Sequence, residues 1–294
     1  MDKIRGMVTP VATPFHEDES INFDVFKQLI EHLLDHKMQY LLIGGSTGEY
    51  SLMTMEERKT MIEFSVKLAD KRAKIIAGCS CARPKDTVEL VQFAEKAGAD
   101  YALVLPPYYM QTSRQGIIDY FNEVAASTNI GIVIYHYPHA TAVKLDPDLI
   151  VELDRIKNIV AIKDTDIMAN TAKLIDLTKD MKDFSVINGE EHNIMGTLAM
   201  GGAGCMGIVF NLVPGEIGAL YDAMIMNDLA KAREINGRIM PLYSLMEEEP
   251  YPGPIKAALE LIGIPMGIPR KPIVPASDEM KAKLRDAMMY AKII

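Results

Sequence analysis

The stretch Ile159-Val160-Ala161-Ile162-Lys163-Asp164-Thr165 decides the fold. Its four consecutive apolar residues predict a strand buried on both faces, as in a parallel sheet covered by helices. Lys163 closes the run, so its stem lies in apolar surroundings and its amine is partly desolvated. A partly neutral amine is the form that attacks a ketone to give a Schiff base. Taken alone, a lysine at a strand end more often reaches solvent, so the interpretation needs support from other segments.

Two further segments follow predicted strands in the same way. Gly44-Gly45-Ser46-Thr47-Gly48-Glu49 follows an early strand, and Tyr135-His136-Tyr137-Pro138 stands at the end of another, with Tyr135 28 residues before Lys163. In an α/β barrel the carboxyl ends of the strands form the face that carries the active site. The three segments together therefore favour one site at one end of a barrel.

Short β-rich runs alternate with helical patterns along most of the chain. The predicted strands are residues 7–11, 40–43, 74–77, 101–105, 130–135, 159–163, 184–188 and 204–209. The predicted helices are residues 23–36, 55–69, 84–97, 113–128, 146–154, 168–179, 191–200 and 216–227. Eight such repeats fit a closed (β/α)8 TIM barrel of about 250 residues. An open doubly wound sheet is disfavoured because no Gly-x-Gly-x-x-Gly follows the first strand.

We predict two parts, a catalytic barrel over residues 1–227 and a helical subdomain over residues 228–294 that packs on it. The C-terminal part contains helical patterns at residues 229–246, 255–262 and 278–292. Stretches rich in proline and glycine separate them, at residues 250–254 and 265–275. This surplus over the minimal barrel indicates a helical extension rather than a second catalytic domain.

Composition excludes several classes of protein. The formal net charge of −9 argues against nucleic acid and anionic membranes as partners. No apolar stretch reaches the length of a membrane span and the opening MDKIRGMVTP has no signal-peptide h-region, so we expect a cytoplasmic protein. Three cysteines, Cys79, Cys81 and Cys205, are too few for a disulfide framework or a zinc site.

The chain resembles the pyruvate-dependent class I aldolase family that includes dihydrodipicolinate synthase, N-acetylneuraminate lyase and 2-keto-3-deoxygluconate aldolase. The resemblance covers nearly the full length. It rests on eight short motifs in order, at residues 9–15, 44–49, 106–109, 135–138, 162–165, 188–190, 201–204 and 254–259. Each motif alone is weak, and their order and spacing together carry the resemblance.

The resemblance implies catalytic roles for four residues. Lys163 falls on the Schiff-base lysine of the family, and Tyr135 on its catalytic tyrosine, which moves protons near the imine. Ser46 falls on a hydroxyl of the proton relay. Tyr109 falls on a tyrosine that family members insert into the site of a neighbouring subunit. The family uses no metal and no organic cofactor, and it implies a homotetramer built as a dimer of dimers.

Further positions are expected to bind substrate. Thr47 and the backbone at Gly45 belong to a loop that can hold the carboxylate of a 2-oxo acid without a cation. The other expected substrate-binding residues are Thr165, Gly189, Glu190, Glu191, His136 and Ile208. His136 stands where the family usually has asparagine. With His139 it has H-x-x-H spacing, but no third ligand is visible, so we expect a contact with a hydroxylated tail and no metal.

Positions at which the chain departs from the pattern of the family narrow the range of expected substrates. Dihydrodipicolinate synthases carry an arginine two residues after the proline of the tyrosine motif, where it binds a second carboxylate, and this chain has Ala140 there. Together with Lys163-Asp164-Thr165, this pattern resembles the 2-keto-3-deoxy sugar-acid aldolases. We therefore expect a lyase that cleaves or forms a carbon–carbon bond between pyruvate and a polyhydroxylated aldehyde.

Several alternatives stay open at this point. A condensing enzyme like dihydrodipicolinate synthase, an N-acetylneuraminate lyase and a 2-oxo acid dehydratase all use the same Schiff-base chemistry. They differ in the aldehyde, or in whether water leaves in its place. A barrel that only senses a 2-oxo acid is disfavoured, because the lysine, the tyrosine and the hydroxyl loop are all present.

Overall fold

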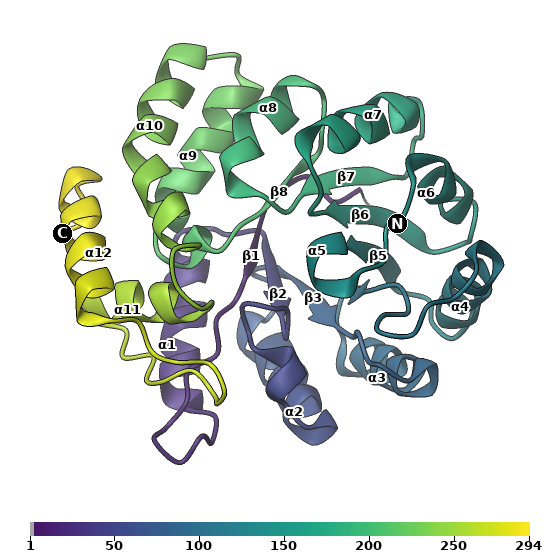
Figure 1. Ribbon diagram of the computed structural model, residues 1–294, viewed down its shortest axis with the longest axis horizontal. Coiled ribbons are helices and arrows are strands. Elements are labelled where there is room, and N and C mark those ends of the chain that lie inside the picture. Colours follow the sequence, from purple (N-terminus) through teal and green to yellow (C-terminus); the bar gives the residue numbers. More distant parts are fainter. Residues whose placement is uncertain (1–2) are drawn as a thin grey trace.

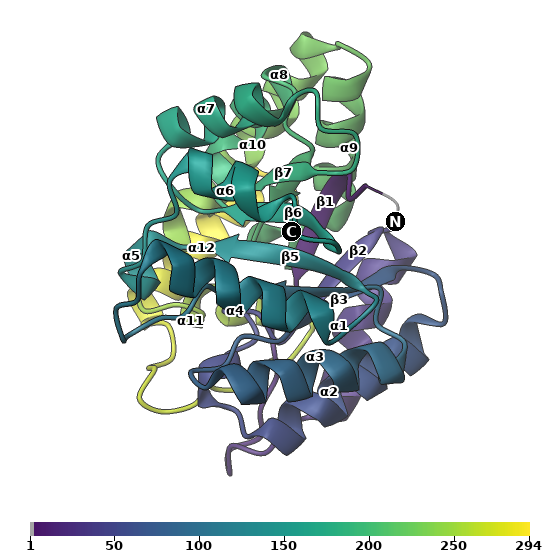
Figure 2. The same cartoon turned by 90° about the vertical axis from the view of Figure 1, so that its right-hand side faces the viewer.

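All eight predicted strands are present in the computed structural model, which describes residues 3–294 (Figures 1 and 2). They pair in parallel and close in chain order into a barrel, which confirms the predicted fold. The strands are β1 Gly6–Pro10, β2 Tyr40–Ile43, β3 Lys74–Gly78, β4 Tyr101–Val104, β5 Gly131–His136, β6 Ile159–Asp164, β7 Ser185–Asn188 and β8 Gly204–Met206.

Helices surround the barrel on the outside (Figure 1). They are α1 Phe23–Asp35, α2 Met55–Ala69, α3 Pro84–Ala97, α4 Arg114–Ala126, α6 Pro147–Leu153, α7 Met168–Thr178, α8 Ile194–Ala199 and α9 Pro214–Ile225. Local signals in the sequence set several of their ends. Thr54 and Glu57 form the predicted capping box of α2, and α3 ends at Gly98, whose left-handed φ of 97° stops the helix.

Three elements differ from the sequence prediction. The short helix α5, Pro138–Thr141, follows β5 and was not predicted. The segment predicted as a helix over residues 191–200 begins as the 3-10 turn η2, Glu191–Asn193, before α8. Strand β8 ends at Met206, and the 3-10 turn η3, Val209–Asn211, takes up the rest of the predicted strand. All three differences lie at carboxyl ends of strands, where the chain leaves the sheet to build the mouth of the barrel.

Side chains along the strands point alternately into the barrel and out toward the helices. On β5, Val133 and Tyr135 belong to the cluster inside the barrel, while Ile132 and Ile134 belong to the core under the helices. On β6, Ile162 packs in the outer core, and the next residue, Lys163, lines the cavity inside the barrel mouth. The alternation therefore decides which residues can reach that cavity.

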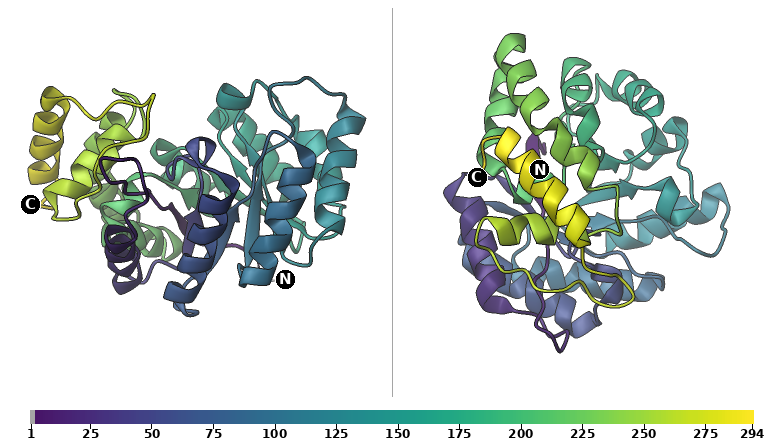
Figure 3. Two further views of the ribbon diagram at one scale, coloured as in Figure 1. Left: turned by 90° about the horizontal axis from the view of Figure 1, so that it is seen from below. Right: turned by 60° about the vertical axis from the view of Figure 1, so that its left-hand side comes forward.

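The C-terminal part consists of α10 Leu229–Leu245, α11 Gly253–Leu261 and α12 Asp278–Tyr290. Helix α10 packs along α9, and α12 packs against α10 and α11 (Figure 3). The boundary that we propose after residue 227 falls in the turn between α9 and α10. Within residues 3–294, every helix is too short or too polar to cross a membrane.

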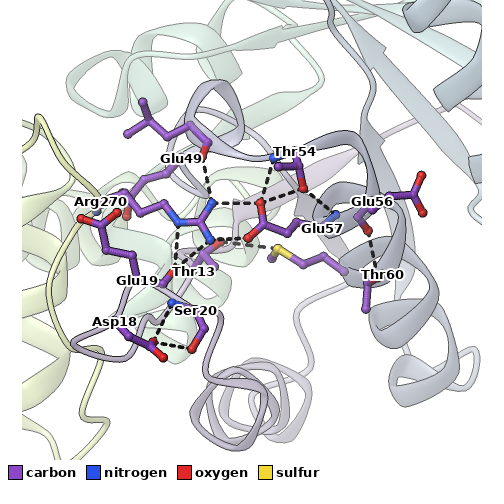
Figure 4. A network of polar contacts seen from close by, with 12 residues as sticks. Thr13, Asp18, Glu19, Ser20, Glu49, Thr54, Glu56, Glu57, Thr60 and Arg270 are labelled. Atoms are coloured by element: carbon purple, nitrogen blue, oxygen red, sulfur yellow. Dashed lines mark hydrogen bonds and ion pairs between the residues drawn. The ribbon is translucent and has the colours of Figure 1, made fainter.

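Arg270 fastens the C-terminal part to the barrel mouth (Figure 4). Its guanidinium donates to both carboxylate oxygens of Glu57 and to the backbone carbonyls of Glu19 and Leu52. The hydrogen bonds from Arg270 are the main cause that lowers the pKa of Glu57 to about 2. The backbone N–H of Arg270 also donates to Glu49 Oε2 over 2.8 Å, so one residue holds both the start of α2 and the loop after β2.

Lys256 of α11 forms a second link to the same loop. Its Nζ lies 2.6 Å from Glu49 Oε1, and both side chains are almost completely buried. The ammonium also donates to the carbonyl of Ile268 and lies 4.4 Å from the centre of the Phe15 ring. Burial of two charges is tolerated because each has its partner in place.

We predict that Lys256→Met lowers the free energy of unfolding by about 3–5 kcal/mol, since it leaves the Glu49 carboxylate buried without its cation. Chemical denaturation measures the change. Lys283→Met is the matched control, because Lys283 makes ion pairs that are exposed to solvent. Equal effects of the two substitutions would contradict the structural importance of the buried pair.

Candidate active site

A cavity of about 210 Å³ opens at the carboxyl ends of the strands. Nine of the predicted site residues line it: Ser46, Thr47, Tyr135, Lys163, Thr165, Gly189, Glu190, Glu191 and Ile208. These residues come from the ends of β2, β5, β6, β7 and β8 and the loops that follow them. The barrel thus brings together residues that are more than a hundred positions apart in the chain.

Lys163 and Tyr135 face each other across neighbouring strands. They are paired in the register of β5 and β6, and Lys163 Nζ lies 4.2 Å from the centre of the Tyr135 ring. Both are buried, with 7% of Lys163 and 4% of Tyr135 exposed. The Tyr135 hydroxyl lies 3.4 Å from Ser46 Oγ, within reach of a hydrogen bond. An amine, a phenol and a hydroxyl therefore meet at one end of the cavity, as a proton relay requires.

The loop after β2 presents hydroxyl groups to the cavity. Gly44 has a left-handed φ of 70°, and the N–H of Gly48 donates to the carbonyl of Gly45 over 3.0 Å, which closes a tight turn. Thr47 Oγ1 accepts a hydrogen bond from the hydroxyl of Tyr251. Gly45 itself does not line the cavity. A Cβ there would meet the Leu42 side chain at 2.9 Å, so its role is to let the loop pass close to β2.

Part of the cavity wall is acidic. Glu190, Glu191, Glu247 and Glu249 line it, and among the described lining residues Lys163 is the one basic side chain. Glu191 accepts a hydrogen bond from the N–H of Val209 over 2.6 Å, and burial raises its pKa to about 8. Burial also raises the pKa of Glu190, and the nearby charge of Glu247 adds to this shift. At neutral pH Glu191 is therefore mostly protonated and can donate a hydrogen bond.

Thr165 and Gly189 shape the wall next to Lys163. Thr165 Oγ1 is buried and finds no hydrogen-bond partner among residues 3–294, as expected of a hydroxyl reserved for a ligand. A Cβ at Gly189 would lie 2.0 Å from that oxygen and 2.9 Å from Lys163 Cε. The absence of a side chain at residue 189 is thus what leaves room for the lysine.

Besides Gly45, two predicted residues lie outside the cavity. His136 is 2% exposed and points outward, where Nδ1 bonds to Asp164 and Nε2 to the N–H of Leu145. It does not reach the cavity, so we do not propose a contact with a substrate tail. Tyr109 is 88% exposed with a φ of 71°, and it takes no part in the cavity of its own chain.

Several lining residues were missed from the sequence. Tyr137 stacks on Tyr135 with ring centres 5.7 Å apart, and the two-residue period of a strand is a signal that could have found it. The connection between α10 and α11 contributes Met246, Glu247, Glu249 and Tyr251. No local pattern indicates that this distant segment covers the barrel mouth.

A (β/α)8 barrel with a buried lysine and tyrosine at the carboxyl ends of β6 and β5 defines a lyase of the class I aldolase type. The sequence profile of the Dihydrodipicolinate synthetase family matches residues 3–291. The chain therefore belongs to this family of pyruvate-dependent enzymes, whose chemistry uses a Schiff-base lysine and no cofactor.

Curated relatives match over nearly the whole chain. A 4-hydroxy-tetrahydrodipicolinate synthase of Methanothrix thermoacetophila is 34% identical over 285 residues, which is 97% of this chain and 96% of the relative. One of Exiguobacterium sibiricum is 35% identical over 289 residues, 98% of each chain. These relatives do not carry the name of a sugar-acid aldolase. The comparisons thus favour the condensing enzyme, an alternative in the sequence analysis, over its main expectation.

Solved structures agree in fold. YagE, a prophage protein of E. coli K12 in the same family, has been solved in complex with pyruvate and is 30% identical, with a TM-score of 0.95 over 99% of both chains. The chloride-inhibited dihydrodipicolinate synthase of Acinetobacter baumannii, also with pyruvate, is 28% identical, with a TM-score of 0.94 over 99% of this chain and all of the other. A monomeric dihydrodipicolinate synthase variant, 28% identical, has a TM-score of 0.94 over 99% and 97% of the two chains, so one similar protein is a monomer.

We predict that Gly189→Ala lowers turnover of pyruvate about 100-fold while the protein stays folded, because the added methyl group displaces Lys163 and Thr165. Steady-state kinetics and circular dichroism measure the two effects. Gly237→Ala in α10 is the matched control, since a Cβ there meets no atom of the described residues within 4 Å. Full activity of the Gly189→Ala variant would mean that the lysine does not need this space.

Proposed function

We propose that the chain is a class I aldolase in which Lys163 forms a Schiff base with pyruvate. The observation that carries this proposal is the buried Lys163 amine 4.2 Å from the ring of Tyr135, at the end of a cavity open to solvent. The amine attacks the keto carbon and water leaves, which gives a protonated imine. Loss of a proton from the adjacent carbon gives an enamine, which attacks the carbonyl carbon of an aldehyde; cleavage is the reverse.

Tyr135 is proposed to move protons in these steps, and the contact with Ser46 supports a route toward solvent. Thr47 lines the cavity, which supports the proposal that it and the tight turn around it bind the carboxylate of pyruvate. The exposed Tyr109 supports an extension of this relay into a second copy of the chain, within a homotetramer built as a dimer of dimers.

The chemistry of the cavity wall supports an aldehyde with an uncharged, hydroxylated tail. Thr165 offers a hydroxyl that has no partner among the described residues, and Glu190 and Glu191 offer carboxyl groups that can accept or donate hydrogen bonds. An anionic tail would be repelled by the ionised carboxylates of this wall and would meet no second cation among the described lining residues. We therefore conclude that 2-keto-3-deoxy sugar acids are the substrates that the site fits best.

The second candidate is condensation of pyruvate with aspartate semialdehyde to 4-hydroxy-tetrahydrodipicolinate. The names of the curated relatives favour it. The acidic wall suits the ammonium group of this aldehyde, but its carboxylate has no cation to bind in the described lining. Membership of a family indicates the class of reaction, whereas the residues of the site select the second substrate.

The Schiff base is tested by trapping. Borohydride in the presence of pyruvate should inactivate the enzyme and add a pyruvate-derived mass to the peptide that contains Lys163. Lys163→Ala should abolish both labelling and turnover, since the nucleophile is lost. Lys283→Ala, at a surface ion pair, serves as the control. Labelling at another lysine, or turnover without labelling, would refute the assignment.

The second substrate is tested by competition. We expect kcat/KM for cleavage of an uncharged-tail 2-keto-3-deoxy sugar acid to exceed that for condensation with aspartate semialdehyde in the same buffer. Glu190→Gln should bring the two kcat/KM values closer together, because it removes one acidic group from the wall. The opposite ranking in the unmodified enzyme would establish the condensing enzyme instead.

A further inference from the structure

His136 and Asp164 directly follow the proposed catalytic pair on β5 and β6. Tyr135 is opposite Lys163 across the two strands, and His136 is opposite Asp164 one residue further. Because side chains alternate, the first pair points into the barrel and the second toward the helices. A rotation of either strand at this level therefore moves both pairs together.

The outer pair is part of a continuous chain of hydrogen bonds. The N–H of Leu145 donates to His136 Nε2 over 3.1 Å, so that nitrogen is unprotonated and Nδ1 carries the ring hydrogen. His136 Nδ1 then donates to Asp164 Oδ1 over 2.7 Å, and the hydroxyl of Thr171 donates to Asp164 Oδ2 over 2.6 Å. These bonds join β5 and β6 to α7 and to the segment before α6.

A polar pair is unusual at this place between sheet and helices. Two residues earlier, Ile134 and Ile162 occupy the same outward face of the two strands and pack as apolar side chains. Both His136 and Asp164 are only 2% exposed, and burial of a carboxylate is costly unless its bonds are satisfied. Apolar contacts leave a strand some freedom to rotate, whereas hydrogen bonds fix direction. The hydrogen bond between His136 and Asp164 thus lies next to the place where Tyr135 and Lys163 meet across β5 and β6.

We infer that His136 and Asp164 are positioning residues, whose hydrogen bond fixes β5 against β6 and so holds the Tyr135 phenol over the Lys163 amine. The inference rests on the proposed function of those two residues. It assigns His136 no contact with substrate. Its effect reaches the reaction through Tyr135, one residue before it in the chain.

Two substitutions at residue 136 distinguish the two hydrogen bonds that the imidazole ring makes. His136→Asn places an amide nitrogen near the position of Nδ1, where it can donate to Asp164. His136→Gln places its amide near Nε2, where it can accept from Leu145 but leaves Asp164 without a donor from β5. We expect the Asn variant to keep kcat within about threefold and the Gln variant to lose about 10–100-fold, with KM for pyruvate changed less than about twofold.

A double-mutant cycle with Tyr135→Phe distinguishes positioning from general stability. If His136 acts through the phenol, His136→Gln should lower kcat less than about twofold in the Tyr135→Phe background, where the phenol hydroxyl is absent. The inference would be overturned if His136→Gln lowered kcat by the same factor in the Tyr135→Phe background as in the unmodified enzyme. It would also be overturned if the Gln variant were as active as the Asn variant. If the Gln variant does not fold, Asp164→Leu breaks the same bond from β6 without leaving an unpaired carboxylate, and the same outcomes apply.

Borohydride trapping with pyruvate separates this inference from the proposed function. No labelling of Lys163 in the unmodified enzyme overturns both. A second outcome overturns only the positioning role. In it, Lys163 is labelled in both the unmodified enzyme and the Gln variant, and the effects of His136→Gln and Tyr135→Phe on kcat are additive. Labelling in both with a non-additive cycle is the result that we expect.

Discussion

The alternation of side chains in a closed parallel barrel is the constraint on which this molecule depends. Once β5 and β6 pair in register, Tyr135 and Lys163 must point to the same side, and that side is the interior. The residues that follow them must point outward, into the layer under the helices. One geometric rule thus creates the cavity with its amine and phenol, and behind it the buried pair of His136 and Asp164. A slip of one residue in either strand would exchange the two sets.

The mouth of the barrel needs a second constraint, because loops at strand ends have no sheet to hold them. Glu49 supplies it after β2, since its carboxylate binds Lys256 and the backbone of Arg270. Those two residues come from the C-terminal part, which also places Tyr251 against Thr47. The helical extension is therefore part of the site. It fixes the hydroxyl loop and closes one wall of the cavity.

Burial sets the chemistry of that cavity as much as residue type does. Glu191 is a carboxylic acid in a place that water barely reaches, so its pKa is raised to about 8 and it can donate a hydrogen bond at neutral pH. Lys163 lines the same cavity as this acidic wall, together with Thr165, whose hydroxyl has no partner among residues 3–294. In the proposed function, the Lys163 end of this cavity binds the 2-oxo acid and the acidic wall selects the second substrate. The names of the relatives favour one second substrate and the acidic wall favours another, because membership of a family indicates the reaction class and the site residues select the substrate.

The sequence by itself determined the barrel, its eight strands and the end at which the site lies, because apolar runs, caps and turns are local signals. It also indicated most of the lining residues, since they directly follow those strands. Tertiary structure decided the rest. His136 faces outward because alternation reverses the side chain after Tyr135, and the tertiary structure decided which of the two faces the interior. The arrival of Glu247, Glu249 and Tyr251 depends on how the last helices pack. It leaves no local trace, because it arises from contacts between segments far apart in the chain.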